Sequence, residues 1–107
     1  MRGQGVNAGQ HMSKRENKAA AAEFRELVGM DFDQFTRQAP VKVLLALARF
    51  AGPVDITVLQ FAGETHPLFQ QQREKLLRAI RFAWQRKDPE TSARRRQMAE
   101  AVRGCRE

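Results

Sequence analysis

The sequence predicts an all-α fold, a compact bundle of five or six short helices around a central apolar helix at about residues 41–51. Two observations support this prediction. The segment PVKVLLALARFAGP, residues 40–53, is apolar nearly all round a helix, so other elements must cover it on several sides. Capping and stop signals divide the rest of the chain into helical lengths, and no hairpin signal separates alternating apolar segments.

The N-terminal part of the chain predicts a leader followed by a helix. Residues 1–12 are rich in Gly, Asn and Gln and lack hydrophobic periodicity. We interpret them as a disordered leader of expression-vector origin, ahead of a natural start at Met12. Ser13 and Glu16 have the spacing of a capping box, in which both side chains satisfy free N–H groups at a helix start. They predict a first helix from Ser13 to about Val28.

Two short helices flank the central one. Asp31 is a suitable N-cap for a helix from Phe32 to about Gln38, which would carry two phenylalanines into the core. Residues 54–63, VDITVLQFAG, fit either a strand, because apolar residues alternate, or a helix, because apolar residues also recur at helical spacing. A lone strand without a partner would be unstable, so we expect a short helix from residue 56 or 57 to Ala62.

Two further helices are predicted toward the C-terminus. The longer one covers about residues 67–87, and the final one covers about residues 89–103, with Gly104 as its stop and only a weak apolar edge. Phe82 falls off the apolar face of the longer helix and is a candidate second contact surface. The chain therefore divides into the leader at 1–12, a helical core at 13–88 and a basic C-terminal helix or tail at 89–107.

Positive charge is concentrated toward the C-terminus. The formal net charge is +7 and the isoelectric point is about 10.8. Residues 67–107 hold eleven Lys and Arg against five Asp and Glu, whereas the preceding 66 residues have a balance of only +1. A surface that binds a polyanion needs such a concentration, because each phosphate contact requires a cation. A solvated helical surface is the alternative interpretation.

The composition also limits the cellular setting. The hydrophobic share of 42% is ordinary for a folded domain. No apolar run approaches the roughly 18 residues that span a bilayer, and the opening segment MRGQGVNAGQ lacks the apolar region of a secretory signal. The single cysteine, Cys105, excludes an internal disulfide and suits a reducing compartment. We therefore expect a cytoplasmic protein with no membrane partner.

No set of residues predicts catalysis, a cofactor or a metal. The two histidines, His11 and His66, have no second ligand at metal-binding spacing. Cys105 has no His or Asn near it in the sequence to activate a nucleophile. A Gly-rich phosphate loop and a Ser/His/Asp motif are also missing from the sequence. We expect a protein that binds rather than catalyses, without a cofactor or a metal.

The helices expected over about residues 41–80 follow one another in a particular order. An apolar helix precedes the short helix VLQFA, a turn at Gly63 and a helix entered through Thr65-His66-Pro67. This order resembles the helix-turn-helix DNA-binding superfamily, in which the second helix of the motif places its N-terminal side chains against base edges. Gln suits adenine in such contacts, and Arg suits guanine. The resemblance implies base contacts from Gln70, Gln71 and Arg73 and phosphate contacts near Lys75, Arg78 and Arg81.

More cations follow along the chain. Arg86 and Lys87 close the longer helix, and the run of arginines at 94–96 points in directions about 100° apart around the final helix. Such a helix suits insertion in a groove, or ordering on binding. Alternatively, these arginines pair with Glu90 and Glu100 and keep the terminus soluble. The predicted nucleic-acid-binding residues are Gln70, Gln71, Arg73, Lys75, Arg78, Arg81, Arg86, Lys87, Arg94, Arg95 and Arg96.

These features predict a small basic nucleic-acid-binding protein, a bacterial, plasmid or phage regulator of transcription or replication. DNA is favoured over RNA, and a homodimer is one expected assembly. The alternative is a small helical adaptor or inhibitor whose basic face docks on an acidic protein partner. The sequence does not separate these two partners, because an acidic protein surface and a phosphate backbone attract the same cations.

Overall fold

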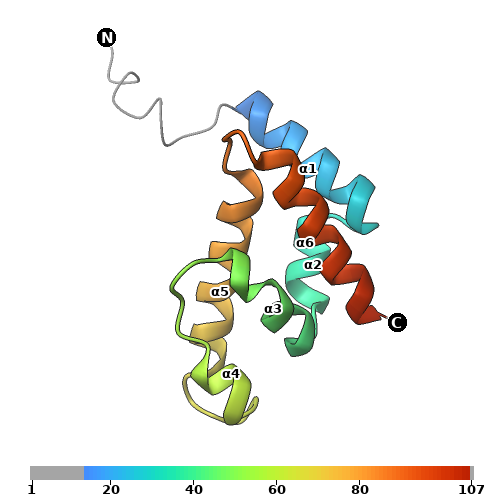
Figure 1. Ribbon diagram of the computed structural model, residues 1–107. Helices are drawn as coiled ribbons and strands as arrows, with labels where there is room; N and C mark the ends of the chain where they lie inside the picture. Colours follow the sequence, from blue (N-terminus) through green and yellow to red (C-terminus); the bar gives the residue numbers. More distant parts are fainter. Residues whose placement is uncertain (1–13, 107) are drawn as a thin grey trace.

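The computed structural model describes residues 14–106, and this part of the chain contains helices and no strand (Figure 1). The all-α prediction is confirmed. The leader predicted at residues 1–12 and the capping residue Ser13 lie outside the described residues. The elements are α1 (Lys14–Val28), α2 (Phe32–Gln38), α3 (Val41–Leu47), the 3-10 helix η2 (Ala48–Phe50), α4 (Thr57–Phe61), α5 (Phe69–Gln85) and α6 (Thr91–Arg106).

Helix α3 lies at the centre of the bundle, as the sequence predicts. In Figure 1 it stands between α5 and α6, and it contacts both of them as well as α4. Its Leu44 and Leu47 are fully buried. The apolar segment does not stay α-helical to its end, because the last turn tightens into η2 before the Gly52-Pro53 stop. Apolar residues on most sides of α3 therefore find partners on three other helices.

An aromatic cluster joins the first two helices to α5. The ring of Phe24 on α1 lies edge-on to Phe32, Phe35 and Trp84, with ring centroids 5.0, 5.5 and 5.1 Å away. Such edge-to-face contacts stabilise a core beyond simple burial. The indole Nε1 of Trp84 donates a hydrogen bond of 2.8 Å to the backbone oxygen of Ala20. The prediction that α2 carries two phenylalanines into the core is confirmed.

The ambiguous segment at residues 54–63 forms a helix and not a strand, so the helical interpretation was right. Asp55 accepts a hydrogen bond of 3.0 Å from the backbone N–H of Thr57, the first residue of α4. That N–H, together with the Thr57 hydroxyl, lowers the pKa of the Asp55 carboxyl below its ordinary value of 3.8. Asp31 caps α2 in a similar way, through a bond of 2.7 Å from the N–H of Gln34.

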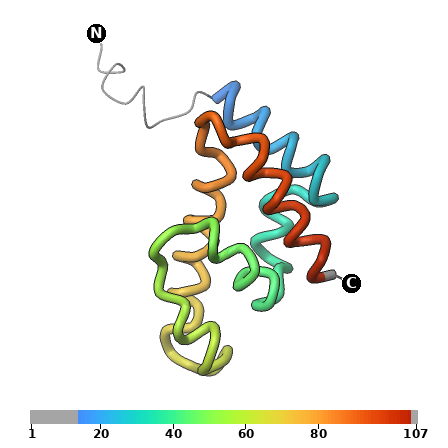
Figure 2. Tube along the Cα trace, in the orientation of Figure 1, coloured from blue at the N-terminus to red at the C-terminus, as the bar shows by residue number. Residues whose placement is uncertain are grey.

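Helix α6 is longer and better packed than the sequence predicts. It runs through Gly104 to Arg106, so the stop expected at Gly104 was wrong. Its Met98, Ala99 and Val102 belong to the same buried core as the other helices, where only a weak apolar edge was expected. Helices α1 and α6 come from opposite ends of the chain and lie side by side (Figure 2).

A tertiary contact explains why α6 continues past its expected end. Arg103 on α6 donates a hydrogen bond of 2.6 Å to the backbone oxygen of Leu27, near the end of α1. Glycine permits a helix to stop but does not force it to, and the packing of Val102 on the core holds this turn in place. Residues 89–107 were predicted to be a separate basic helix or tail, yet the described part of this segment shares the core.

Candidate nucleic-acid interface

Helix α5 separates its side chains into a buried face and an exposed face. The buried face carries Phe69, Leu76, Ile80 and Trp84, among others. We call the exposed side the outer face of α5; its members are Gln70, Gln71, Glu74, Lys75, Arg78, Arg81 and Phe82. Five of the predicted nucleic-acid-binding residues, Gln70, Gln71, Lys75, Arg78 and Arg81, therefore lie together on one exposed surface.

The outer face follows from helical spacing. Positions 71, 75, 78 and 82 recur every three or four residues, which places them on one side of a helix. At 1.5 Å per residue the seventeen residues of α5 extend about 25 Å. The face carries three cations and one carboxylate, that of Glu74. Within the described residues, Lys75 and Arg78 form no ion pair, although the charge of Lys75 contributes to the lowered pKa of Asp55.

The turn before α5 sets where the outer face begins. Gly63 adopts a φ of +88°, a left-handed conformation that residues with a side chain rarely tolerate. The ring Nδ1 of His66 then accepts a hydrogen bond of 3.0 Å from the backbone N–H of Leu68, just ahead of the first turn of α5. Helix α4 lies at the end of the molecule beside the start of α5 (Figure 1). Gln70 and Gln71 are thus exposed in the first turn of α5.

Arg73 was predicted to contact a base, and the structure places it elsewhere. Its guanidinium donates to the backbone oxygens of Thr36 and Ala39, at 3.0 and 3.1 Å, where α2 ends. These carbonyl groups lack partners within α2, and a cation at a helix C-terminus is also favoured by the helix dipole. Arg73 follows the buried Phe69 by one helical turn, so it lies toward the core side of α5 and is only half-exposed.

Arg94 was predicted to face nucleic acid, yet only 8% of it is exposed. Its Nε donates to the backbone oxygen of Ala83 at 2.8 Å, and its Nη1 lies 3.1 Å from both carboxylate oxygens of Asp88. Ala83 is among the last residues of α5, whose carbonyl groups have no partner within the helix. Arg94 therefore closes the end of α5 and is not available to a ligand.

Arg95 has the same role one residue further along. It is also 8% exposed, and its Nε donates to the backbone oxygen of Trp84 at 2.7 Å. Its Nη1 forms an ion pair of 2.7 Å with Glu23 on α1. Of the three consecutive arginines only Arg96 is exposed, as expected for side chains that point 100° apart. The ion-pair partners of the buried pair are Asp88 and Glu23, not Glu90 or Glu100.

Asp88 organises the junction between α5 and α6. Its Oδ1 accepts a hydrogen bond of 2.8 Å from the backbone N–H of Glu90, and its Oδ2 pairs with Arg86 at 3.0 Å. The Glu90 N–H, followed by the bond to Arg94, lowers the pKa of Asp88 below its ordinary value of 3.8. Arg86 is thus exposed but paired with Asp88. Lys87 is likewise exposed and lies 3.6 Å from the carboxylate of Glu16.

Two structural features of this region were not predicted from the sequence. Gln72 is 8% exposed, and its Oε1 accepts a hydrogen bond of 3.0 Å from the backbone N–H of Val58. Its spacing from Phe69 and Leu76 would have placed it on the buried face. Phe61, at the end of α4, is 82% exposed. No pattern in the sequence distinguishes that phenylalanine from the buried ones of the neighbouring helices.

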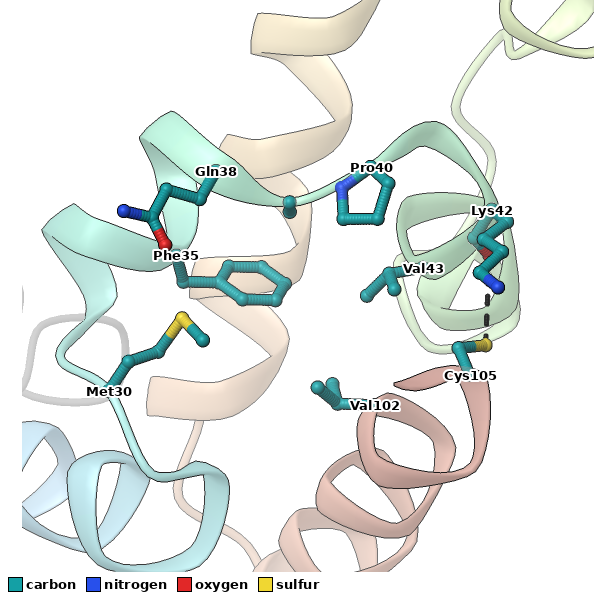
Figure 3. A pocket seen from close by; sticks show the side chains of 9 residues that line it. Met30, Phe35, Gln38, Pro40, Lys42, Val43, Val102 and Cys105 are labelled. Carbon is teal, nitrogen blue, oxygen red and sulfur yellow. Dashed lines mark hydrogen bonds between the residues drawn. The ribbon is translucent and has the colours of Figure 1, made fainter. Parts of the chain in front are cut away.

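One pocket of the described residues is lined by residues outside α5. It has a volume of about 300 Å³ and opens between α2, α3 and α6 (Figure 3). In Figure 3, Phe35 and Val43 point toward each other from α2 and α3, and Val102 lies below them on α6. The thiol of Cys105 is 4.0 Å from the backbone oxygen of Lys42 at its edge. The lining contains no carboxylate and no histidine, and its two titratable side chains are Lys42 and Cys105.

Comparisons with protein-family models, with curated proteins and with solved structures find no match in any of the three. Within residues 14–106, no group of three His, Cys, Asp or Glu side chains is placed to hold a metal ion. None of the helices described is both long enough and apolar enough to cross a membrane.

Proposed function

We propose that the protein binds nucleic acid, DNA in preference to RNA, through the outer face of α5, and acts as a regulator rather than as an enzyme. The single observation that supports this most is the grouping of Gln70, Gln71, Lys75 and Arg78 on one exposed helix face. None of the ion pairs between described residues involves Lys75 or Arg78. The order of α3, α4 and α5, which resembles a helix-turn-helix protein, supports it as well.

The shape and chemistry of this face suit a groove. An α-helix with its side chains is about 10–12 Å wide, close to the roughly 12 Å width of the DNA major groove. The side-chain amide of Gln71 can both donate to and accept from an adenine edge. Lys75 and Arg78 lie one and two turns further along and would contact phosphates. Arg73, Arg94 and Arg95 are not part of this proposal, because their guanidinium groups donate hydrogen bonds to backbone oxygens inside the fold.

Labelled duplex DNA titrated with the protein across a salt series tests the proposal. Each phosphate contact contributes about one unit to the slope of log affinity against log salt. We expect Lys75→Gln and Arg78→Gln each to lower that slope by about one unit. Arg25→Gln, which removes an exposed charge from α1, is the matched control and should leave it unchanged. If the slope fell equally in all three variants, binding would depend on the net charge of the protein and not on the outer face of α5.

Base recognition is tested separately from phosphate contact. We expect Gln71→Ala to relax the sequence preference at one base position by about 1–3 kcal/mol, measured with a set of duplexes that differ at single positions. Gln38→Ala, an exposed glutamine on α2, is the matched control. Tight binding without any sequence preference would assign the protein to architectural binding instead.

A second candidate function is supported by a different surface. Phe61 is 82% exposed and Leu68 is 46% exposed, near the two ends of the turn that joins α4 to α5. Exposed apolar side chains favour a protein partner, as in an adaptor or inhibitor. The adaptor function replaces the nucleic-acid function if two results are obtained. The protein binds neither duplex DNA nor RNA at low salt, and it captures an acidic protein that the Arg78→Gln variant fails to capture.

A further inference from the structure

Phe82 is an exposed aromatic ring on α5 with an arginine four residues before it and another four residues after it in the sequence. It is 58% exposed, on the outer face of α5. Arg78 lies four residues before it, and Arg86 lies four residues after it and just past the end of the helix. Residues four apart on a helix are neighbours on its surface, so Arg78 is the cation next to Phe82 on α5, whereas the guanidinium of Arg86 is bonded to Asp88. Phe82 is the only exposed large apolar side chain on the described length of α5.

The isolation of this ring indicates what kind of ligand it suits. A protein partner that docks through apolar contacts needs several apolar side chains close together, because burial free energy scales with area. The residues three and four positions from Phe82 provide little such area; they are Arg78, Ala79, Gln85 and Arg86. A nucleotide instead needs one flat ring for its base and a nearby cation for its phosphate. The surroundings of Phe82 match the second requirement.

We propose that Phe82 stacks on an unpaired base of the bound nucleic acid, so that the target combines a duplex with a single-stranded segment. The inference rests on the proposed function of the outer face and adds the class of target. Bases within a duplex are already stacked on each other, and separating them costs free energy, so an exposed ring stacks most readily on a base that is not paired. Gln71 and Phe82 are eleven residues apart, or about 16 Å along the helix. The unpaired base therefore lies within about five nucleotides of the base that Gln71 contacts.

Fluorescence anisotropy with two labelled DNA probes tests this inference. One probe is a blunt duplex, and the other is the same duplex with a tail of about five unpaired nucleotides. We expect the wild-type protein to bind the tailed probe more tightly. Phe82→Leu keeps an apolar side chain but removes the ring, and it should weaken binding to the tailed probe about 5- to 150-fold while leaving the blunt duplex nearly unaffected.

Two further variants separate stacking from general apolar contact. Phe82→Tyr retains the ring and should bind the tailed probe within about twofold of wild type. Phe61→Leu changes an exposed phenylalanine outside α5 and should change neither affinity. A Phe82→Tyr variant as weak as Phe82→Leu would overturn the inference, and so would equal losses on both probes. Because Phe82 is exposed, these variants should keep the melting temperature of the wild type, which is checked first.

The outcome also distinguishes failure of this inference from failure of the proposed function. If the wild type binds the blunt duplex and Arg78→Gln weakens that binding, but Phe82→Leu has no effect on either probe, the duplex-binding function stands and the stacking role is rejected. If the wild type binds neither probe at low salt, both proposals are rejected. A base analogue such as 2-aminopurine in the tail gives an independent readout, since its fluorescence falls when it stacks on a ring.

Discussion

The side chain of Gln72 on α5 accepts a hydrogen bond from the backbone N–H of Val58 in the first turn of α4, at 3.0 Å. Both residues are buried. The first N–H groups of a helix have no partner within it, so a side chain from another helix here replaces a local cap. This bond holds the short helix α4 against α5. It thereby also positions the turn between the two helices, which precedes the outer face.

Gln72→Leu should therefore destabilise the protein. It leaves the N–H of Val58 buried without an acceptor, which costs about 1–3 kcal/mol. Urea denaturation of the two proteins measures the difference in free energy of unfolding. Gln70→Leu, two residues away and exposed, is the matched control and should change stability by no more than about 0.5 kcal/mol. Equal effects of the two substitutions would contradict the capping role of Gln72.

The three consecutive arginines of α6 should differ in what they contribute. Arg94→Met removes the donors that close the end of α5, and we expect a loss of about 1.5–3 kcal/mol of stability. Arg96→Met makes the same chemical change at an exposed position and should cost less than about 0.5 kcal/mol. Thermal unfolding monitored by circular dichroism measures both. A large effect of Arg96→Met together with a small one of Arg94→Met would refute the structural assignment.

The junction at Asp88 should give the stability a defined dependence on pH. The pKa of Asp88 is lowered in the folded protein, so the ionised carboxylate stabilises the fold. This contribution is fully present above the ordinary pKa of 3.8 and is lost as the pH falls through the lower folded-state value. The stability difference between wild type and Asp88→Asn should therefore be largest near about pH 7 and should shrink below about pH 4. Urea midpoints across this range measure it, and a constant difference would contradict the prediction.

Because α3 lies at the centre of the bundle, substitutions of its buried residues should lower the stability of the protein strongly. Leu44 is fully buried, and Leu44→Ala should cost about 2–5 kcal/mol because it leaves a cavity among three helices. Leu68→Ala, at a half-exposed position before α5, should cost much less. Urea denaturation of both variants tests this prediction. A midpoint unchanged by Leu44→Ala would be incompatible with a central α3.

Much of the fold was predictable because it depends on local signals. The N-cap role of Asp31 and the helical state of residues 57–61 follow from residues within a few positions of each other. The exposure of Phe82 follows from helical spacing on α5 alone. The outer face was predicted for the same reason, since an amphipathic helix must turn its polar side to solvent.

The sequence by itself determined that the described part of the chain folds into helices without strands, that residues 41–51 lie at its centre and which side of α5 is exposed. Only the tertiary structure decided that Arg73, Arg94 and Arg95 bond to backbone carbonyl groups inside the fold. In the sequence they do not differ from the arginines that are exposed. The physical reason is that a guanidinium group can satisfy either a phosphate or the free carbonyl groups at a helix end. Which of the two it meets depends on where another helix ends in space, and that position is fixed by packing between residues far apart in the chain.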